Sequence, residues 1–374
     1  MKLIDEVATV LSMLNDKGYE AYLVGGAVRN ILLDMPINDY DIATNADPNA
    51  IKMIFADYVI YDVGKKHGTV AIIINKIKIE ITPYRKEADY IDHRHPQEIS
   101  FDATLEEDLK RRDFTINAMC LDKDLQVIDL FGGIDDLKNK TIRAIGSPAA
   151  RFHEDALRIL RALRFKAKLD FEIEENTRKE IFNCLDLLRY ISNERKREEL
   201  LALLSCKKAF EIINEYLPIF NSFMPLVRID RKENDFSNPL SSLAYLLANC
   251  DKTDLKKLKY SKDEISLINI LIEATSIDIN DDYQLISILS HMHKKQILEY
   301  LQELHHIDLS SRYDLLSMYI VDFDELNIDG NAIKAYGYEG KDIARIKKEL
   351  LEQIHQKKLI NDSETLNAYL LKKV

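Results

Sequence analysis

The spacing of hydrophobic and polar positions changes near residue 140 of the chain. Before it, apolar residues occur in short strand-like runs such as GTVAIIIN and KIKIEITPYR, which meet at Asn75 and Lys76. These runs predict two strands, and the polar pair between them predicts a hairpin turn. Beyond about residue 150, apolar residues recur every three or four positions, the spacing of helices with one buried side. We therefore predict a mixed α/β N-terminal part followed by helices.

A glycine pair interrupts the pattern early in the chain. YEAYLVGG predicts a short buried strand that ends in a turn at Gly25 and Gly26, and AVRNILL predicts the start of a helix with Arg29 in its first turn. Glycines let the backbone approach a ligand closely, and the start of a helix directs free N–H groups at an anion. The segment has the outline of a phosphate cradle, without being a Walker A loop or a dinucleotide fingerprint.

Three carboxylates fall on predicted strands of this part. Asp39 and Asp41 in NDYDIAT are two positions apart and point the same way on a strand, where they repel each other unless a divalent cation lies between them. Glu80 lies on the polar face of KIKIEITPYR and could supply a third acid. Mg²⁺ prefers one or two carboxylates plus substrate phosphates. The competing interpretation is a solvated strand end, the usual context of a lone pair of aspartates.

Charged residues cluster in RFHEDALRILRALRF, residues 151–165. Read as one helix, this stretch places Glu154, Asp155, Arg158 and Arg161 close together on adjoining turns. Without other motifs, the simplest interpretation is a surface salt bridge. In RRDFTINAM, Arg112 and Asp113 precede an apolar segment, and Asp113 alone would be interpreted as a helix N-cap.

Composition narrows the class of protein. The chain has 374 residues, of which 46% are hydrophobic and 31% charged, and its length predicts more than one domain. The net charge of −11 argues mildly against a nucleic-acid binder but allows a local basic patch. The scattered cysteines and the lack of an apolar run long enough to span a membrane lead us to expect a cytoplasmic protein with no membrane partner.

The motifs together resemble one family. LVGGAVRN, INDYDIAT, EITPYR, RRDFTINAM, the stretch from DLFGGIDDL to RALRF, and ISNERKREEL occur in order over residues 20–205. They are similar to the successive motifs of the class II tRNA nucleotidyltransferases, the bacterial CCA-adding enzymes and poly(A) polymerases of the DNA polymerase β superfamily. The resemblance implies template-independent addition of C, C and A to the 3′ end of tRNA from CTP and ATP, with release of pyrophosphate.

The resemblance also implies the fold. We expect an elongated molecule with an α+β nucleotidyltransferase head, built on a small mixed sheet with helices, followed by an all-α neck, body and tail. The expected boundaries are residues 1–140 for the head, 141–205 for the neck, 206–310 for the body and 311–374 for the tail. We expect the tail to bind tRNA at its acceptor end and T arm, and we expect no DNA partner.

Site roles carry over by resemblance to matching positions. Asp39 and Asp41 would bind two catalytic Mg²⁺ ions, of which one would activate the tRNA 3′-hydroxyl and the other would bind the triphosphate, and Glu80 would be a further catalytic acid. Asp113 would contact the ribose 2′-hydroxyl. The expected nucleotide-binding residues are Gly25, Gly26, Arg29, Arg112, Asp113, Glu154, Asp155, Arg158 and Arg161.

The same resemblance implies that Asp155 and Arg158 select the base of the incoming nucleotide. Cytosine and adenine both present an amine that donates beside a ring nitrogen that accepts, whereas uracil and guanine present the reverse. Asp155 would accept from the amine and Arg158 would donate to the ring nitrogen, while Glu154 would orient Arg158. A wrong base would leave buried charged groups unpaired, so the pair would select CTP and ATP without a template. Arg161, one turn further along, would reach phosphates.

The motifs do not decide which nucleotides the enzyme adds. The polar segment KEADYIDHRHPQEISFDATLEEDLK, which follows EITPYR, corresponds to a mobile family loop that is shortened in enzymes that add only CC, and no gap is evident here. This favours CCA addition or A addition over CC addition, and a surface loop without such a role stays possible from sequence. A poly(A) polymerase, or an RNA-binding protein that has lost catalysis, would keep many of the same motifs.

Overall fold

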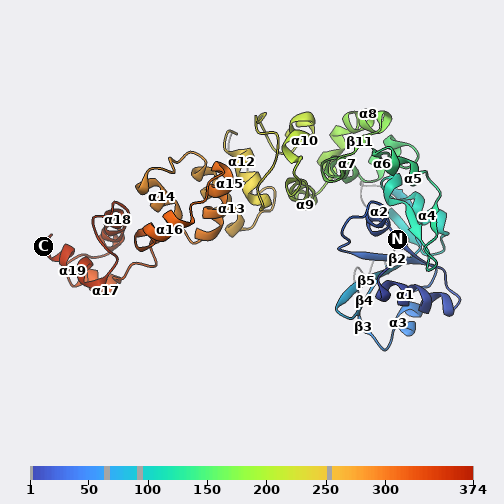
Figure 1. The fold of residues 1–374 in the computed structure, drawn as a ribbon, viewed down its shortest axis with the longest axis horizontal. Coiled ribbons are helices and arrows are strands. Elements are labelled where there is room, and N and C mark those ends of the chain that lie inside the picture. Colours follow the sequence, from blue (N-terminus) through green and yellow to red (C-terminus); the bar gives the residue numbers. More distant parts are fainter. Residues whose placement is uncertain (1–2, 63–67, 91–95, 251–254, 374) are drawn as a thin grey trace. The chain divides into compact units, whose positions relative to one another are not determined.

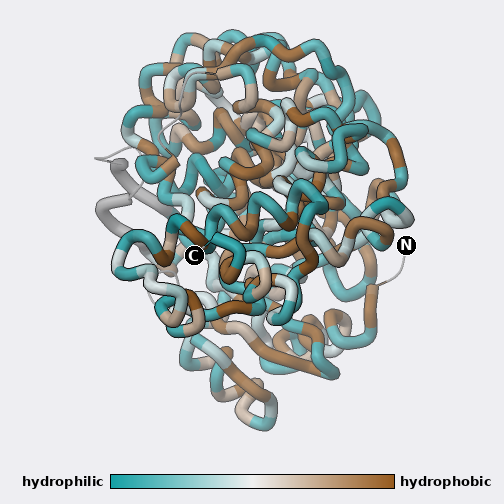
Figure 2. The backbone as a smooth tube through the Cα atoms, turned by 90° about the vertical axis from the view of Figure 1, so that its left-hand side faces the viewer, coloured by the Kyte–Doolittle hydropathy of each residue, from teal (hydrophilic) through white to brown (hydrophobic). Residues whose placement is uncertain are grey.

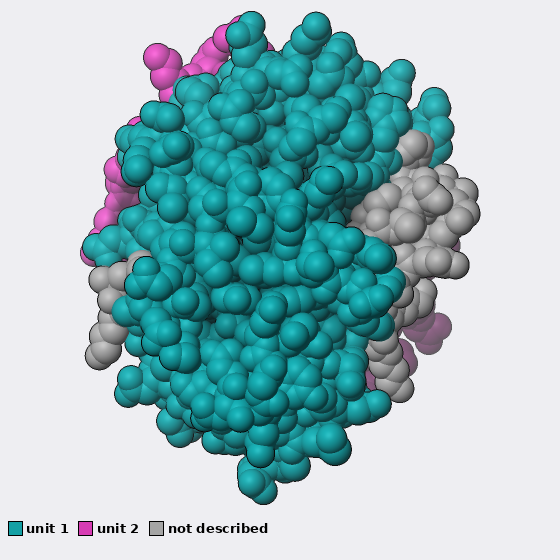
Figure 3. All heavy atoms as spheres, turned by 90° about the vertical axis from the view of Figure 1, so that its right-hand side faces the viewer, with its two compact units in different colours: residues 1–224 teal, residues 225–374 magenta. Residues whose placement is uncertain are grey.

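The chain folds into two compact units, residues 1–224 and 225–374 (Figures 1 and 3). The structure is a computed structural model that describes residues 3–62, 68–90, 96–250 and 255–373. Each unit has its own buried apolar residues and is described by itself.

Unit 1 begins with a mixed seven-stranded sheet in the order β3-β4-β5-β2-β1-β8-β9. Strand β2 pairs antiparallel with β1 and parallel with β5, which confirms the small mixed sheet expected for the head. The strands are β1 (Ala21–Val24), β2 (Tyr40–Thr44), β3 (Val59–Asp62), β4 (Val70–Ile74), β5 (Ile77–Pro83), β8 (Met119–Leu121) and β9 (Val127–Asp129).

The predicted hairpin joins β4 to β5. Asn75 and Lys76 both have positive φ, 49° and 70°, as a two-residue turn between twisted strands requires. In β5, Ile79 and Ile81 are fully buried, whereas Glu80 lies on the other face. The alternation read from the sequence is therefore the alternation of the strand.

Helices cover this sheet. The helix α1 (Asp5–Asp16) buries Val7, Val10, Leu11 and Leu14, an apolar stripe at helical spacing. The others are α2 (Gly26–Leu32), α3 (Pro48–Ile54), α4 (Leu105–Lys110) and α5 (Gly133–Lys138), with a 3₁₀ turn η1 (Thr115–Asn117).

The segment expected to be a loop after EITPYR contains regular structure. β6 (Lys86–Tyr90) and β7 (Pro96–Ser100) pair antiparallel in a separate two-stranded sheet. Thr104 and Glu107 then form a reciprocal capping box at the start of α4. Residues 91–95, including His93 and His95, lie outside the described residues.

The rest of unit 1 is mainly helical. A short parallel pair, β10 (Thr141–Ile142) and β11 (Glu172–Ile173), was not predicted from the sequence. The helix α7 (Leu157–Leu169) packs against α9 (Asn193–Leu204) and α10 (Ala209–Glu215) and buries Ile159, Ala162 and Leu163 completely. The helices are α6 (Pro148–Glu154), α7 (Leu157–Leu169), α8 (Glu175–Asn183), η2 (Leu185–Tyr190), α9 (Asn193–Leu204), α10 (Ala209–Glu215) and α11 (Leu217–Asn221).

The described part of unit 2 contains helices and no strand, which confirms the all-α C-terminal part. In Figure 2, apolar and polar stretches alternate along the helices, as expected of elements with one buried side. Its helices are α12 (Pro239–Leu247), α13 (Lys262–Ala274), α14 (Asp282–Leu289), α15 (Lys294–His305), α16 (Ser310–Leu316), η3 (Ser317–Tyr319), α17 (Gly330–Lys334), α18 (Lys341–His355) and α19 (Ser363–Leu371).

The start of α13 is set by its local sequence. Lys259 takes a left-handed φ of 63°, and Ser261 caps the helix together with Glu264, so that α13 begins at Lys262. Among the helices of the described residues, none is both long enough and apolar enough to span a lipid bilayer.

Candidate active site

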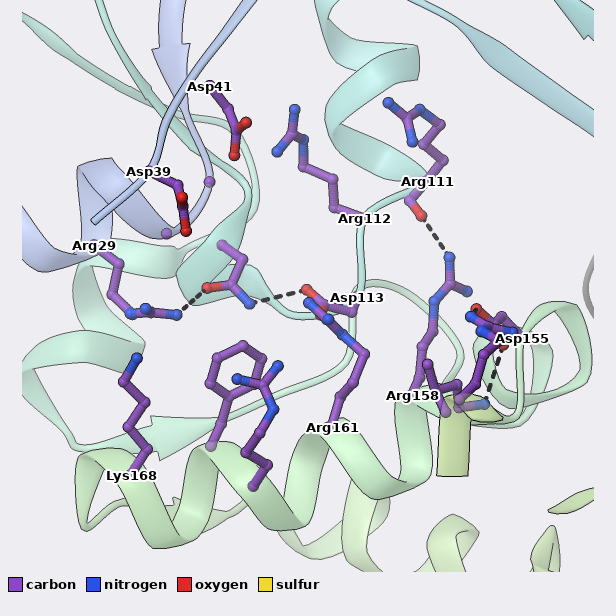
Figure 4. Close-up of a pocket in the computed structure, with 17 residues that line it drawn as sticks. Arg29, Asp39, Asp41, Arg111, Arg112, Asp113, Asp155, Arg158, Arg161 and Lys168 are labelled. Carbon is purple, nitrogen blue, oxygen red and sulfur yellow. Dashed lines mark hydrogen bonds and ion pairs between the residues drawn. The ribbon is translucent and has the colours of Figure 1, made fainter. Parts of the chain in front are cut away.

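Asp41 of β2 and Asp39, which directly precedes this strand, share one cavity of unit 1. Asp41 lies opposite Val24 of β1 and Glu80 of β5, and Asp39 precedes the strand. Asp39 and Asp41 both line a cavity of about 540 Å³ (Figure 4). Although Asp41 is exposed to the cavity, the surrounding protein displaces solvent and raises its pKa, and Glu80 and Asp39 raise it further by repulsion. The prediction that these aspartates point into one space is confirmed.

Glu80 is set slightly apart from the other two acids. It lines a second cavity of about 250 Å³ with Asp39 and Asp41, and it is absent from the lining of the main one. Its Oε1 lies 2.6 Å from Nζ of Lys78, an ion pair that is largely exposed. Glu80 therefore lies next to the two aspartates, and its carboxylate is paired with Lys78.

The glycine turn lies beside an arginine of a distant motif. Gly25 has a φ of 71°, which disfavours any side chain, and a Cβ at this position would lie 3.2 Å from Nη1 of Arg112. Gly25 and Gly26 both line the cavity. The turn therefore combines backbone freedom with close packing against Arg112.

Arg29 of α2 enters the same cavity, and no carboxylate of the described residues forms an ion pair with it. Its side chain is buried and donates to the amide oxygens of Asn30 and Asn117, the latter at 2.6 Å. Burial lowers the pKa of Arg29 to about 10, despite the charge of Asp113. A buried guanidinium that faces a cavity with only neutral partners is suited to bind an anion.

Arg111 and Arg112 are held by one buried acid. Asp108, whose side chain is 1% exposed, lies 2.6 Å from Arg111 and 3.1 Å from Arg112. Burial alone would raise the pKa of Asp108, but the two guanidinium groups lower it overall. Sequence reasoning did not single out Asp108, although it lies four positions before Arg112 on α4.

Both carboxylate oxygens of Asp113 accept hydrogen bonds from other residues of the protein. Oδ1 accepts from the Phe114 N–H and the Asn117 side chain, and Oδ2 accepts from Arg161 at 2.8 Å. Burial would raise the pKa of Asp113, but Arg161 and Asn117 lower it to about 2. The 3₁₀ turn that follows has Phe114 as its N-cap, so Asp113 is not a conventional cap.

The helix expected through residues 151–165 is broken, which corrects the prediction of a continuous helix. α6 ends at Glu154, Asp155 takes an extended conformation, and α7 begins at Leu157, whose N–H donates to Asp155 Oδ1. Arg195 of α9 forms an ion pair with Asp155, and Nη2 of the arginine lies 2.7 Å from Oδ2 of the aspartate. Asp155 and Arg158 still line the same cavity, although neither is the other's ion-pair partner.

Arg158 is held from three sides. It donates to Glu154 Oε2 at 2.6 Å and to the carbonyl oxygens of Arg151 and Arg111. Glu154 also pairs with Arg151, and it does not line the cavity itself. The predicted role of Glu154, to orient Arg158, agrees with this arrangement.

Several lining residues were not predicted individually. They continue the α7 stripe of Arg158 and Arg161 at three- and four-residue intervals, or come from the neighbouring motifs already quoted. A helical continuation of that stripe would have found Phe165 and Lys168. The unpredicted lining residues are Arg111, Asn117, Leu157, Arg164, Phe165, Lys168 and Arg195.

The cavity is cationic in an otherwise acidic chain. Among the described residues, eight Arg or Lys side chains and four aspartates line it, although the chain carries a net charge of −11. No group of three His, Cys, Asp or Glu side chains in the described part is arranged to hold a metal alone. A site with two acids beside many cations fits a metal whose remaining ligands come from a polyanionic substrate.

Comparison with known proteins agrees with this picture. Residues 21–143 match the family model "Poly A polymerase head domain", and residues 170–216 match "Probable RNA and SrmB-binding site of polymerase A". The CCA-adding enzyme of Streptococcus sanguinis strain SK36 is 39% identical over 396 residues, covering 98% of this chain and 97% of its own.

The chain belongs to the CCA-adding enzyme family. The resemblance to tRNA nucleotidyltransferases inferred from the motifs is therefore confirmed.

Solved structures of this family share the fold. The CCA-adding enzyme of Bacillus stearothermophilus in complex with CTP matches with a TM-score of 0.82 and 27% identity, covering 100% of this chain and 98% of that one. A tRNA nucleotidyltransferase complexed with a primer tRNA and an incoming ATP analog matches with a TM-score of 0.60 and 25% identity, over 82% and 96% of the chains. These proteins use nucleotide and tRNA ligands in the fold that this family member adopts.

Proposed function

We propose that this chain adds C, C and A to the 3′ end of tRNA, using CTP and ATP and releasing pyrophosphate. The single observation that carries the proposal is the cavity that holds Asp39 and Asp41 opposite Asp155 and Arg158. The similarity to the Streptococcus sanguinis CCA-adding enzyme over nearly the whole of both chains supports the same activity.

Asp39 and Asp41 would hold catalytic Mg²⁺, with Glu80 as a neighbouring acid. Their fit to a hard cation rests on the donor set and on the raised pKa of Asp41, which reflects displaced solvent and the repulsion of Glu80 and Asp39. When bound, Mg²⁺ would supply Lewis-acid activation of the tRNA 3′-hydroxyl and stabilisation of the leaving pyrophosphate.

Asp155 and Arg158 would read the Watson–Crick edge of the incoming base. The carboxylate accepts from the exocyclic amine shared by cytosine and adenine, and the guanidinium donates to the adjacent ring nitrogen. Arg195 holds the first group and Glu154 the second, so both are positioned before a nucleotide binds. This preorganisation favours selectivity, because a mismatched base must leave a fixed charge unpaired.

The interior contacts of Asp113 favour an indirect role for this acid. A carboxylate offers about four acceptor positions, and donors from Phe114, Asn117 and both Nε and Nη2 of Arg161 occupy them. We therefore propose that Asp113 positions Arg161 beside the ribose and phosphates. A direct bond to the 2′-hydroxyl would require one of these donors to leave.

Gly25, Gly26, Arg29 and Arg112 would surround the phosphates. The turn brings backbone close to the cavity, and the two guanidinium groups add charge beside the aspartates. The cationic excess of the cavity supports a triphosphate substrate over a neutral one.

We further propose the division into head, neck, body and tail at residues 1–140, 141–205, 206–310 and 311–374, with the helical tail contacting tRNA. Exposed basic residues of α18, such as Lys341 and Arg345, would meet phosphates of the acceptor end and T arm through salt-sensitive contacts. We propose a cytoplasmic location, where tRNA and both nucleotides are present.

Nucleotide addition to defined tRNAs tests the function. The protein is incubated with Mg²⁺, single labelled nucleotides, and tRNAs that lack CCA, end in C or end in CC. We expect C on the first two substrates and A on the third, with no U or G. No incorporation on any substrate would refute the proposal, and A addition to tRNA ending in CC with no C addition to the other two substrates would identify an A-adding enzyme.

A second candidate is poly(A) polymerase activity, favoured by the head-domain family match over residues 21–143. It predicts long A tails on an unrelated RNA with ATP alone. Addition that stops after one A on tRNA would exclude it.

A further inference from the structure

One end of the cavity gathers cations around an aromatic ring. Phe165 of α7 is 4% exposed, and the Cζ atoms of Arg29, Arg161 and Arg164 lie 5.0, 5.4 and 4.5 Å from its ring centroid. Lys168, three positions further along α7, lines the same cavity. In Figure 4, Arg29 and Lys168 lie together at the end opposite Asp155, with Asp39 nearby.

The acids at this end do not balance these cations. Arg161 pairs with Asp113 at 2.7 Å, and Arg164 pairs with Glu199 at 2.6 Å. Within the described residues, Arg29 donates only to amide oxygens, and no carboxylate forms an ion pair with Lys168. Two cations therefore face the cavity without an acidic partner, as expected where an anionic group binds.

The surroundings of Lys168 support this interpretation. Its partial burial, together with Arg29 and Arg164, lowers its pKa, and the charge of Asp39 acts in the opposite direction. Lys168 is thus within electrostatic range of a cation from α2 and of a proposed metal-binding acid. Lys168 is itself solvent-exposed, but these charged neighbours distinguish it from a lysine on a helix face surrounded by water alone.

Helix geometry connects this lysine to the base-reading residue. Arg158 and Lys168 are ten positions apart on α7, which runs without a break from Leu157 to Leu169. At 1.5 Å per residue the two positions are about 15 Å apart along the axis. That separation is of the order of a nucleoside triphosphate extended from its base to its terminal phosphate.

We propose that Lys168, supported by Arg29, binds the terminal phosphate of the incoming CTP or ATP, so that α7 contacts both ends of the nucleotide. This inference rests on the proposed function and extends it, because Lys168 then makes the enzyme discriminate nucleoside triphosphates from diphosphates and monophosphates. The rigid helix would fix the distance between the two contacts.

Direct binding measurements on the full-length protein test this role. Dissociation constants for CTP, CDP and CMP are measured by calorimetry with Mg²⁺ and without tRNA, for wild type, Lys168→Met, Lys168→Arg and the control Lys179→Met. Lys179 is exposed on α8 of the same unit and does not line the cavity. Circular dichroism and thermal melting show that each variant is folded.

We expect Lys168→Met to weaken CTP binding by about tenfold or more, because a charge-assisted contact is lost. Binding of CMP should not change, Lys168→Arg should recover part of the CTP affinity, and Lys179→Met should match wild type. In C addition, Lys168→Met should raise the KM for CTP and leave the KM for tRNA unchanged.

Equal losses for CTP and CMP, or no loss for either, would overturn the inference. A raised KM for tRNA alone would also overturn it and would place Lys168 at the RNA backbone instead. A wild-type protein that binds CTP but adds neither C nor A would refute the proposed function, while the comparison of CTP with CMP would still decide the role of Lys168.

Discussion

Arg195 forms a bidentate ion pair with Asp155. Its Nη1 lies 3.1 Å from Oδ1 and its Nη2 lies 2.7 Å from Oδ2. The two residues are forty positions apart and come from α9 and from the break between α6 and α7. The pair holds Asp155 in its extended conformation, with its Oδ1 also capping α7 through the Leu157 N–H. Asp155 is thereby a fixed acceptor.

Replacing Arg195 should therefore weaken nucleotide recognition more than it slows turnover. We expect Arg195→Met to raise the KM for CTP and ATP about tenfold, through loss of a bidentate contact, with a smaller effect on kcat. Arg195→Lys, which keeps the charge but offers one donor group, should recover part of the loss. Steady-state kinetics with saturating tRNA measure both constants.

Arg189→Met is the matched control, because Arg189 donates to the exposed Tyr190 hydroxyl outside the cavity. If Arg195→Met lowered kcat alone and left both KM values unchanged, Arg195 would not act by positioning Asp155.

Asp41→Asn should abolish nucleotide addition and yet stabilise the metal-free protein. The folded-state pKa of Asp41 is raised, so its charged form is less favourable in the folded than in the unfolded chain. Its contribution therefore becomes destabilising as pH rises through the unfolded and then the folded pKa. Without metal, the melting temperature of Asp41→Asn should exceed that of wild type at pH 7 and approach it in acid.

Added Mg²⁺ provides a second measurement on the same pair. It should raise the melting temperature of wild type, by binding only the folded chain, and have a much smaller effect on Asp41→Asn. An equal increase in both proteins would contradict our assignment of Asp41 as a metal ligand.

Arg158→Lys should relax base selection. Lysine keeps the charge but cannot reproduce the planar set of donors that contacts Glu154 and two backbone carbonyls. The ratio of kcat/KM for CTP over UTP should fall by roughly 5- to 150-fold, corresponding to about 1–3 kcal/mol. Competition between labelled CTP and UTP on one tRNA measures this ratio directly.

Glu154→Gln should produce a milder loss of selectivity, since glutamine retains an acceptor for Arg158 but removes the charge. Unchanged selectivity in both variants would rule out base reading by Arg158.

Asp113→Asn should destabilise the fold at neutral pH. The pKa of Asp113 is lowered to about 2 in the folded chain from an ordinary value of 3.8. Its contribution is therefore present above the unfolded value and is lost as pH falls from about 4 towards 2. The shift corresponds to about 2 kcal/mol.

Urea unfolding of wild type and Asp113→Asn at several pH values measures this contribution. The difference in unfolding free energy should be largest above pH 5 and shrink in acid. A difference that did not depend on pH would show that the charge of Asp113 is not what stabilises the fold.

Local patterns were sufficient to predict four of the seven strands of the sheet and, in the cavity, the glycine turn, Arg29 and the two aspartates. The alternation around Glu80 depends only on strand geometry, and the two-residue spacing of Asp39 and Asp41 predicted one shared direction, although Asp39 directly precedes β2. The hairpin at Asn75 and Lys76 follows from its polar pair. Family resemblance added Asp155 and Arg158, whose roles no spacing rule could assign.

Local sequence patterns could not predict contacts between residues that are far apart in the sequence. No Pro or Gly marks the break at Asp155, because Arg195 and the capping of α7 stabilise it from outside the local sequence. The interior partners of Asp113 come from positions 114, 117 and 161, and their convergence depends on how η1 packs beside α7. Lys168 differs from these cases, because a helical continuation of the stripe of Arg158 and Arg161 on α7 would have found it.

The parallel pairing of Asp41 with Glu80 joins the cavity to the interior of the sheet. Glu80 lies between Ile79 and Ile81, both fully buried, so a shift of β5 by one residue would bring an isoleucine beside Asp41 and drive Glu80 into the apolar layer. Misalignment of this strand would thus unfold the sheet before it could yield an intact but inactive molecule. Quality control that recognises exposed apolar surface would then also remove copies with a misassembled site.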